Sequence, residues 1–287
     1  MRQAFLCGKD RFSGRDFGHR RAWLERRLAF VASVFSIDLL AYAIMHNHYH
    51  VVVRIDNESV ATWTDEQVIK SWGKLFRLPD GDVEPAKIAL WRQRLCDLGW
   101  FMRCLNEPLA RIANKEDGCK GRFWEGRYQL QALLDERALL RCMAYVDLNP
   151  IRATIANDPE SSLHTSIRAR IQGNDQHLMP FSSSKLITSP LPISRHEYLA
   201  LVDFTGRELQ FGKRGRIPPG LPSIMQRLGL EPAEWLAEVT HFGQWYFRAV
   251  GPLHKFDAYC QYLGQRWLRG RRRCGALSGA GGLRCLT

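Results

Sequence analysis

The sequence lacks the features of a membrane-inserted or exported protein. No apolar run reaches the about 18 to 20 residues that a membrane-spanning helix needs. The N-terminus, MRQAFLCGKDRFSGRDFGHRR, is crowded with charge and has no apolar core of the signal-peptide kind. We therefore expect a soluble protein, with no membrane partner, that stays in the compartment where it is made.

Closely spaced cysteine pairs are also missing. The chain has 8 cysteines, and none forms a C-x-x-C pair, so zinc-ribbon and thioredoxin-like sites have no support. In a chain without an export signal we expect reduced thiols that are mostly buried. No internal repeat is present either.

Acidic residues are scarce relative to basic ones. The chain has 41 Lys and Arg against 29 Asp and Glu, a net charge of +12. Residues 194–287 alone carry 14 basic and 7 acidic residues, which is +7, and the densest run is RWLRGRRR at 266–273. This balance favours a polyanionic partner, usually nucleic acid, over the alternative of a basic surface without function.

The patterns along the first half of the chain predict an α+β fold. RRAWLERRLAFVASVFS has helical spacing, and IDLLAYAIM and HYHVVVRI read as two strands of a β-hairpin with its turn at His46-Asn47. Residues 62–118 read as a helical insertion. RFWEGRYQLQALL alternates like another strand, and Asp135 is the expected N-cap of a helix that Pro150 should end.

The second half reads as a linker followed by helices. Residues 157–193 are rich in Ser, Pro and polar residues and predict a linker with one short helix. Residues 194–275 predict a basic helical domain, and 276–287 a disordered tail. SIMQRLGLEPAEWLAEV has the helix, glycine turn and helix of a loose helix-turn-helix, so this part either recognises a DNA hairpin stem or is a plain helical cap.

Two histidines stand on one face of the predicted second strand. Because strand side chains alternate, His48 and His50 lie about 6.5 Å apart on the same side. Two imidazoles so placed can share a metal ion, or they can be surface histidines of an edge strand. Val51, Val53 and Ile55 indicate that the opposite side is covered. His46 lies in the turn and need not belong to the pair.

Tyr145 lies away from the apolar stripe of its predicted helix. Leu139, Leu140, Met143 and Val146 fall within an arc of about 120°, and Tyr145 lies about 150° from its middle. Asn149 follows one turn later on the same flank. Taken alone, the pair fits an exposed tyrosine beside a C-terminal Asn cap.

The histidine strand and the helix with Tyr145 and Asn149 together resemble a known family. MHNHYH before a β-branched strand, then GRFWEGRYQLQALLDE and LLRCMAYVDLNPIRA, resemble the IS200-like HUH transposases with a single catalytic tyrosine. The branch is the one associated with repetitive extragenic palindromes, and the resemblance covers residues 4–170. It implies a ferredoxin-like antiparallel sheet with helices on one face, a transposase domain over 1–156 and a C-terminal all-α extension.

The resemblance also implies a site and a reaction. His48, His50 and Asn149 would bind Mg²⁺ or Mn²⁺, although two His ligands also suit zinc. Tyr145 would attack single-stranded DNA, with hairpin structure, and form a 5′-phosphotyrosine link. The predicted DNA-binding residues are arginines: Arg122, Arg127, Arg152, Arg266, Arg269, Arg271, Arg272 and Arg273. Arg122, Arg127, Arg141 and Arg152 could hold phosphates or be solvated surface charge. Phe123 and Trp124 could stack on an unpaired base, but packing onto the core is the favoured interpretation.

The chain departs from the family pattern at two places. His46 replaces the usual Pro of the turn, and the chain starts at MRQAFL, so we expect the first strand to be largely missing and a neighbouring edge to be exposed or filled by another segment. The expected function is DNA transposition and recombination in the bacterial cytoplasm, on the nucleoid, by a monomer or homodimer. The alternatives are a catalytically silent DNA-binding protein and a metal-dependent hydrolase without a tyrosyl intermediate.

Overall fold

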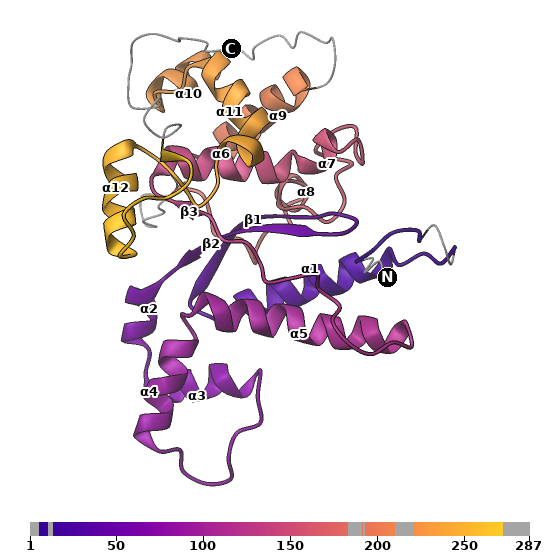
Figure 1. Cartoon of the computed structure of the whole chain (residues 1–287), viewed down its shortest axis with the longest axis vertical. Coiled ribbons are helices and arrows are strands. Elements are labelled where there is room, and N and C mark those ends of the chain that lie inside the picture. Colours follow the sequence, from indigo (N-terminus) through magenta and orange to yellow (C-terminus); the bar gives the residue numbers. More distant parts are fainter. Residues whose placement is uncertain (1–5, 11–13, 183–190, 192, 210–220, 272–287) are drawn as a thin grey trace. The chain divides into compact units, whose positions relative to one another are not determined.

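The computed structural model describes residues 6–10, 14–182, 191, 193–209 and 221–271. The chain divides into two compact units, residues 1–128 with 160–179, and residues 129–159 with 180–287 (Figure 1). Both strands and helices are present, so the predicted α+β class is confirmed at this level. None of the described helices is long and apolar enough to cross a membrane.

The first unit is built on a helix followed by a β-hairpin. Helix α1 spans His19–Ala32, β1 spans Ile37–Ile44 and β2 spans Tyr49–Ile55. The strands pair antiparallel from Ile37 opposite Ile55 to Ile44 opposite Tyr49, with an irregularity between Leu39 and Ala41. The predicted helix and hairpin are confirmed, and in the part of the chain that the structure describes β2 pairs with β1 alone.

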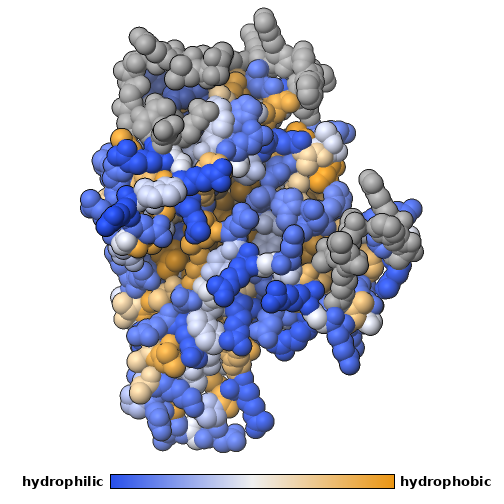
Figure 2. Space-filling model, viewed as in Figure 1, coloured by the Kyte–Doolittle hydropathy of each residue, from blue (hydrophilic) through white to orange (hydrophobic). Residues whose placement is uncertain are grey.

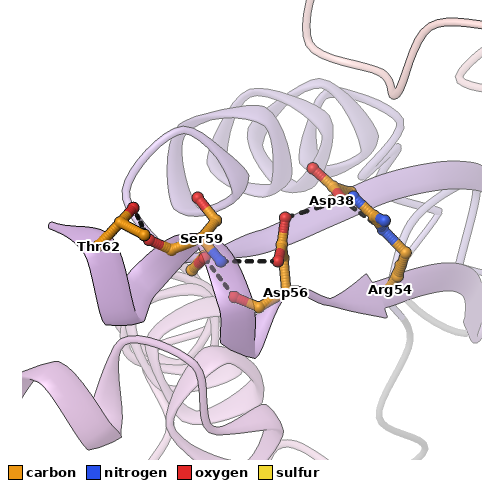
Figure 3. A network of polar contacts seen from close by, with 6 residues as sticks. Asp38, Arg54, Asp56, Ser59 and Thr62 are labelled. Carbon is orange, nitrogen blue, oxygen red and sulfur yellow. Dashed lines mark hydrogen bonds and ion pairs between the residues drawn. The ribbon is translucent and has the colours of Figure 1, made fainter. Parts of the chain in front are cut away.

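The open end of the hairpin is fixed by a polar network (Figure 3). Arg54 donates to Asp38, its partner across the two strands, at 2.8 and 2.6 Å. Asp56 accepts the backbone N–H of Ser59 at 2.9 Å and so caps the next helix. Because Arg54 and Asp56 are both held, the register of the hairpin is set at the end opposite to its turn.

Four helices follow the hairpin and confirm the helical pattern predicted over residues 62–118. They are α2 (Asn57–Thr62), α3 (Asp65–Gly73), α4 (Pro85–Arg94) and α5 (Leu98–Glu116). Trp72 of α3 stacks on Trp91 of α4, with ring centroids 5.4 Å apart. Helix α5 packs along α1, and Arg20, only 1% exposed, joins them through Glu116 and Asp117 (Figure 1).

Residues 160–179 belong to the first unit, whereas the sequence placed them in a linker over 157–193. Helix α8 (Ser166–Ile171) lies within them, as the expected short helix. Ser166 Oγ accepts the backbone N–H of Tyr42 at 2.8 Å, and Arg170 donates to Leu40 O at 2.8 Å. This segment therefore covers the free edge of β1, which a flexible linker does not do. Residues 183–190 and 192 of the predicted linker lie outside the described residues.

The second unit contains the helix that carries Tyr145 together with the C-terminal helices. Its helices are α6 (Glu136–Asp147), α7 (Asn149–Arg152), α9 (Arg195–Leu209), α10 (Leu221–Arg227), α11 (Pro232–Trp245) and α12 (Leu253–Tyr262). Helix α6 packs on α11. Asp135 Oδ1 accepts the N–H of Ala138 at 2.7 Å, which confirms the predicted N-cap, and α6 ends before Pro150. The units thus divide the chain elsewhere than the predicted boundary at residue 156.

The strand predicted over residues 122–134 is wrong except at its end. Only β3, Ala132–Leu133, is a strand, and it pairs in parallel with β4, Ala249–Val250. Most side chains from Glu125 to Leu130 are exposed. An alternating segment forms a strand only where a neighbouring strand pairs with its backbone N–H and C=O groups. None of the described strands pairs with the residues before Ala132.

Six cysteines lie among the described residues and all are free. Cys7, Cys104 and Cys260 are buried, two others are half-buried and Cys119 is exposed. The predicted disordered tail, 276–287, lies outside the described residues.

Candidate functional site

The histidines lie at the closed end of the β1–β2 hairpin. Met45 N donates to His48 O at 2.9 Å, which closes the predicted turn at His46 and Asn47. A segment near the N-terminus braces this turn, because Cys7 N donates to His46 O at 2.8 Å and Cys7 Sγ to Met45 O at 2.8 Å. Hydrogen bonds within the hairpin and from Cys7 therefore hold the loop that carries the imidazoles.

His48 and His50 are brought together as predicted. Their ring centroids lie 4.9 Å apart and the rings are nearly perpendicular, at 86°. His48 is exposed and His50 half-buried. His50 pairs across the strands with Ala43. The opposite face carries Val51 and Val53 against the hydrophobic core, as predicted, whereas Ile55 is exposed.

The chemistry of this pair fits a divalent cation. Partial burial lowers the pKa of His48, so its imidazole is neutral at neutral pH, which is the form that ligates metals. His48 Nδ1 lies 2.7 Å from Asn47 Oδ1. An Nδ1–H donated to that oxygen leaves Nε2 with its lone pair for a ligand. Within the described ranges no three His, Cys, Asp or Glu side chains form a metal cluster.

Tyr49, between the two histidines, has a structural role. Its hydroxyl donates to Asn106 Oδ1 at 2.5 Å, and its ring packs edge-on against Trp124. Burial raises its pKa above the ordinary value for tyrosine. Trp124 in turn donates to Asn106 O at 3.2 Å, and Phe123 is buried. Phe123 and Trp124 therefore pack within the first unit, which confirms for both residues the favoured interpretation of core packing over base stacking.

Tyr145 is not the exposed tyrosine that helical periodicity predicts. It is half-buried, and its ring lies 5.3 Å from that of Phe242 on α11. The guanidinium of Arg152 lies over the same ring at 4.6 Å. The Tyr145 hydroxyl reaches Gly243, where a Cβ would come within 2.6 Å of it. Because Gly243 is exposed, the hydroxyl lies close to the surface of the unit although the ring is packed.

Asn149 begins the short helix α7 and is 9% exposed. It lies one turn after Tyr145 in the same unit, whereas His48 and His50 belong to the other unit. Each half of the predicted site is therefore described within its own unit, and the joint site of His48, His50, Tyr145 and Asn149 stays a prediction.

Arg141, considered for phosphate binding, has another role. It is 7% exposed and forms a close ion pair with Glu238 of α11, which is 1% exposed and also accepts from the Tyr246 hydroxyl at 3.0 Å. Burial raises the pKa of Glu238 to about 7, against the opposing effect of Arg141. Arg141 is thus a buried structural cation, and a contact with DNA is ruled out by its burial.

The predicted DNA-binding arginines fall into three groups. Arg122, Arg127 and Arg266 are exposed. Arg152 is anchored to Thr240 O at 2.7 Å, Arg269 lies over the Phe247 ring at 4.0 Å, and Arg271 is paired with Asp257 through two bonds of 2.8 Å. Arg272 and Arg273 lie outside the described residues.

Sequence reasoning missed several residues that shape these regions. Asn47 adjoins His48 in sequence and could have been found from its place between two histidines. Glu238 and Gly243 lie about a hundred residues beyond their partners on α6, so no local pattern could have indicated them. No family model, curated protein or solved structure matches the chain.

Proposed function

We propose that the chain is a DNA transposase of the single-tyrosine HUH kind, which cleaves single-stranded DNA and transfers the strand. The observation that carries the proposal is the histidine pair. Two neighbouring imidazoles, one of them beside Asn47, lie at the end of a strand whose other face carries the half-buried Val51 and Val53 packed against the core. The order of helix, antiparallel hairpin and helix also supports a ferredoxin-like arrangement, of which this is the middle part.

The proposed metal ligands are His48, His50 and Asn149. A bound Mg²⁺ or Mn²⁺ would neutralise charge on the scissile phosphate and on the attacking oxygen. Two neutral imidazoles and an amide carry no charge of their own, so they leave the positive charge of the ion undiminished for the phosphate. Asn47 keeps His48 in the tautomer that presents Nε2.

Tyr145 is the proposed nucleophile. Its oxygen forms a bond to phosphorus while the bond from phosphorus to the 3′ oxygen breaks, and the leaving oxygen takes up a proton to give a free 3′-hydroxyl. The 5′-phosphotyrosine ester keeps the bond energy, so attack by another 3′-hydroxyl completes strand transfer without ATP. Arg152, whose guanidinium lies over the Tyr145 ring, would hold a phosphate beside this hydroxyl.

The test is a denaturing gel of the full chain with end-labelled, hairpin-bearing single-stranded DNA and manganese. We expect a covalent adduct for the wild type and none for Tyr145→Phe, whose ring still packs on Phe242. Tyr128→Phe is the matched control, since Tyr128 is 42% exposed and should not affect the adduct. The double variant His48→Ala, His50→Ala should bind DNA but form no adduct. Adduct with Tyr145→Phe would identify another nucleophile.

A second candidate is a catalytically silent DNA-binding protein. The packing of the Tyr145 ring against Phe242 and Arg152 favours it, because a nucleophile so held has little freedom to meet a phosphate. No adduct with any DNA, together with retained DNA binding, would establish this candidate instead.

A further inference from the structure

The last described segment of the chain exposes aromatic rings that a folded core would be expected to cover. Tyr262, at the end of α12, is 84% exposed and Trp267 is 72% exposed. Phe247, before β4, is 38% exposed. Removing such rings from water is favourable, so their exposure indicates a binding partner that supplies flat apolar surfaces.

The exposed rings are held in place by the folded segment around them. Leu268 is 7% exposed and packs with Phe256 and Cys260, so the residue after Trp267 anchors the turn. Gln265 N donates to Cys260 O at 3.0 Å, and Cys260 Sγ donates to Gln265 O at 2.9 Å. Tyr262 is stacked with Tyr259, with centroids 6.4 Å apart. A surface fixed in this way loses little conformational entropy when it binds.

The segment that carries these rings is basic. Between residues 246 and 271 the only acidic residue is Asp257, which Arg271 neutralises, and the basic residues Arg248, Lys255, Arg266 and Arg269 are exposed. Arg269 lies over the Phe247 ring at 4.0 Å, so a cation and a ring form one composite surface. Figure 2 shows strongly hydrophilic residues over the region where Figure 1 draws α12.

We propose that α12 and the turn after it, residues 253–271, bind unpaired bases of single-stranded DNA. Tyr262 and Trp267 stack on bases while Arg266 and Arg269 contact the backbone phosphates, which is the chemistry of sequence-tolerant single-strand binding. A duplex hides its bases, and an acidic peptide offers no series of flat rings, so the combination of rings and cations favours a single strand. The inference rests on the proposed function for the identity of the polymer as DNA, but it needs neither Tyr145 nor a metal.

The test measures binding of the full chain to a fluorescent oligo(dT) without hairpin, by anisotropy, in the absence of divalent metal. Each lost stacking ring should weaken binding about tenfold, so Tyr262→Ala with Trp267→Ala should weaken it about a hundredfold. Phe30→Ala is the matched control, because Phe30 is 37% exposed and belongs to the other unit. Arg266→Gln with Arg269→Gln should lower the salt dependence of binding.

Two further readouts distinguish base stacking from a role of the rings in duplex binding or in dimer formation. Oligo(dT) carrying 5-iodouracil should crosslink to Tyr262 or Trp267, as mapped by mass spectrometry. Binding to duplex DNA of equal length should change little in the aromatic double variant. Unchanged oligo(dT) affinity in that variant would overturn the inference, and so would an equal loss for duplex DNA. A loss of dimer in that variant without loss of DNA affinity would show that the rings meet a second copy of the chain.

The result can be read independently of the proposed function. If no covalent adduct forms but oligo(dT) binding depends on Tyr262 and Trp267, the transposase proposal fails and the base-stacking surface stands. If the adduct forms normally in the aromatic double variant and oligo(dT) affinity is unchanged, the transposase proposal stands and the base-stacking surface fails.

Discussion

His48 and Tyr145, the two side chains on which the proposed chemistry depends, have opposite surroundings. His48 is exposed at a hairpin end, and its neighbours Asn47 and His50 come from the same stretch of sequence. Tyr145 lies on a helix with buried residues on nearly every side, against Phe242 and Gly243 of a helix about a hundred residues later. A site built from local neighbours can be seen in the sequence, whereas one built from distant neighbours depends on packing.

The surroundings of Tyr145 also contain a buried ion pair. Arg141 and Glu238 form a buried ion pair between α6 and α11, while the histidine turn is held by backbone hydrogen bonds. The two regions should therefore respond differently to substitution and to pH. For the same reason, deleting residues 194–287 would remove the partner of α6 as well as basic charge, and charge substitutions are the cleaner test of DNA affinity.

The largest effect is expected from Arg141→Ala. At a pH well above 7, where the Glu238 side chain is ionised, it leaves the carboxylate buried without its partner, which typically costs about 3 to 5 kcal/mol of unfolding free energy. Arg103→Ala is the control, since the exposed pair of Arg103 and Glu107 on α5 should be worth less than about 1 kcal/mol. Urea unfolding measures both. Similar losses in the two variants would mean that the buried pair does not distinguish α6 from an ordinary surface helix.

The next effect is a pH dependence carried by Glu238. Because burial raises its pKa from 4.5 to about 7, the folded state holds a proton more tightly than the unfolded state between these values. Stability should therefore fall as pH rises from about 4.5 to about 7, by up to about 3 kcal/mol. Glu238→Gln should remove this slope, measured as the difference between variant and wild type across that range. Parallel curves would show that Glu238 titrates normally.

Gly243→Ala should have a smaller effect on the free energy of unfolding, and whether it stabilises or destabilises depends on Tyr145. Alanine is intrinsically better than glycine in a helix by about 1 kcal/mol, but here its Cβ would come 2.6 Å from the Tyr145 hydroxyl. Since Phe242 and Arg152 hold the ring, we expect a net loss of about 1 to 2 kcal/mol.

In the Tyr145→Phe background the same substitution should cost less or stabilise, because the oxygen that meets the Cβ is gone. A double-mutant cycle by urea unfolding gives the coupling. Zero coupling would show that the hydroxyl does not rest against Gly243.

The smallest effect concerns the histidine turn. Asn47→Ala removes the acceptor at His48 Nδ1 and should weaken Mn²⁺ binding about tenfold, as loss of an orienting partner typically does. Stability should hardly change, because the side chain is exposed. Asn57→Ala, another exposed asparagine of the same unit, is the control in calorimetric titration with Mn²⁺. Equal affinity in both variants would leave Asn47 without a role in metal binding.

The hairpin, its turn, the pairing of His48 with His50 and the start of α6 could all be predicted from the amino-acid sequence. These features depend on contacts between residues a few positions apart: alternation of side chains along a strand, the cap at Asp135, and neighbours on one strand. Interactions between residues close in the sequence can be inferred from the sequence alone, and for that reason the predictions for these elements agree with the structure.

Other features depend on contacts between segments that lie far apart in the sequence. Residues 122–131 alternate like a strand but have no partner strand among the described residues, residues 160–179 cover the edge of β1, and Tyr145 packs on α11. Each outcome depends on which distant segment supplies hydrogen bonds or apolar surface to a local pattern that is compatible with several answers. A periodicity shows which residues of an element share a face, but what covers that face is settled by the free energy of packing the whole chain.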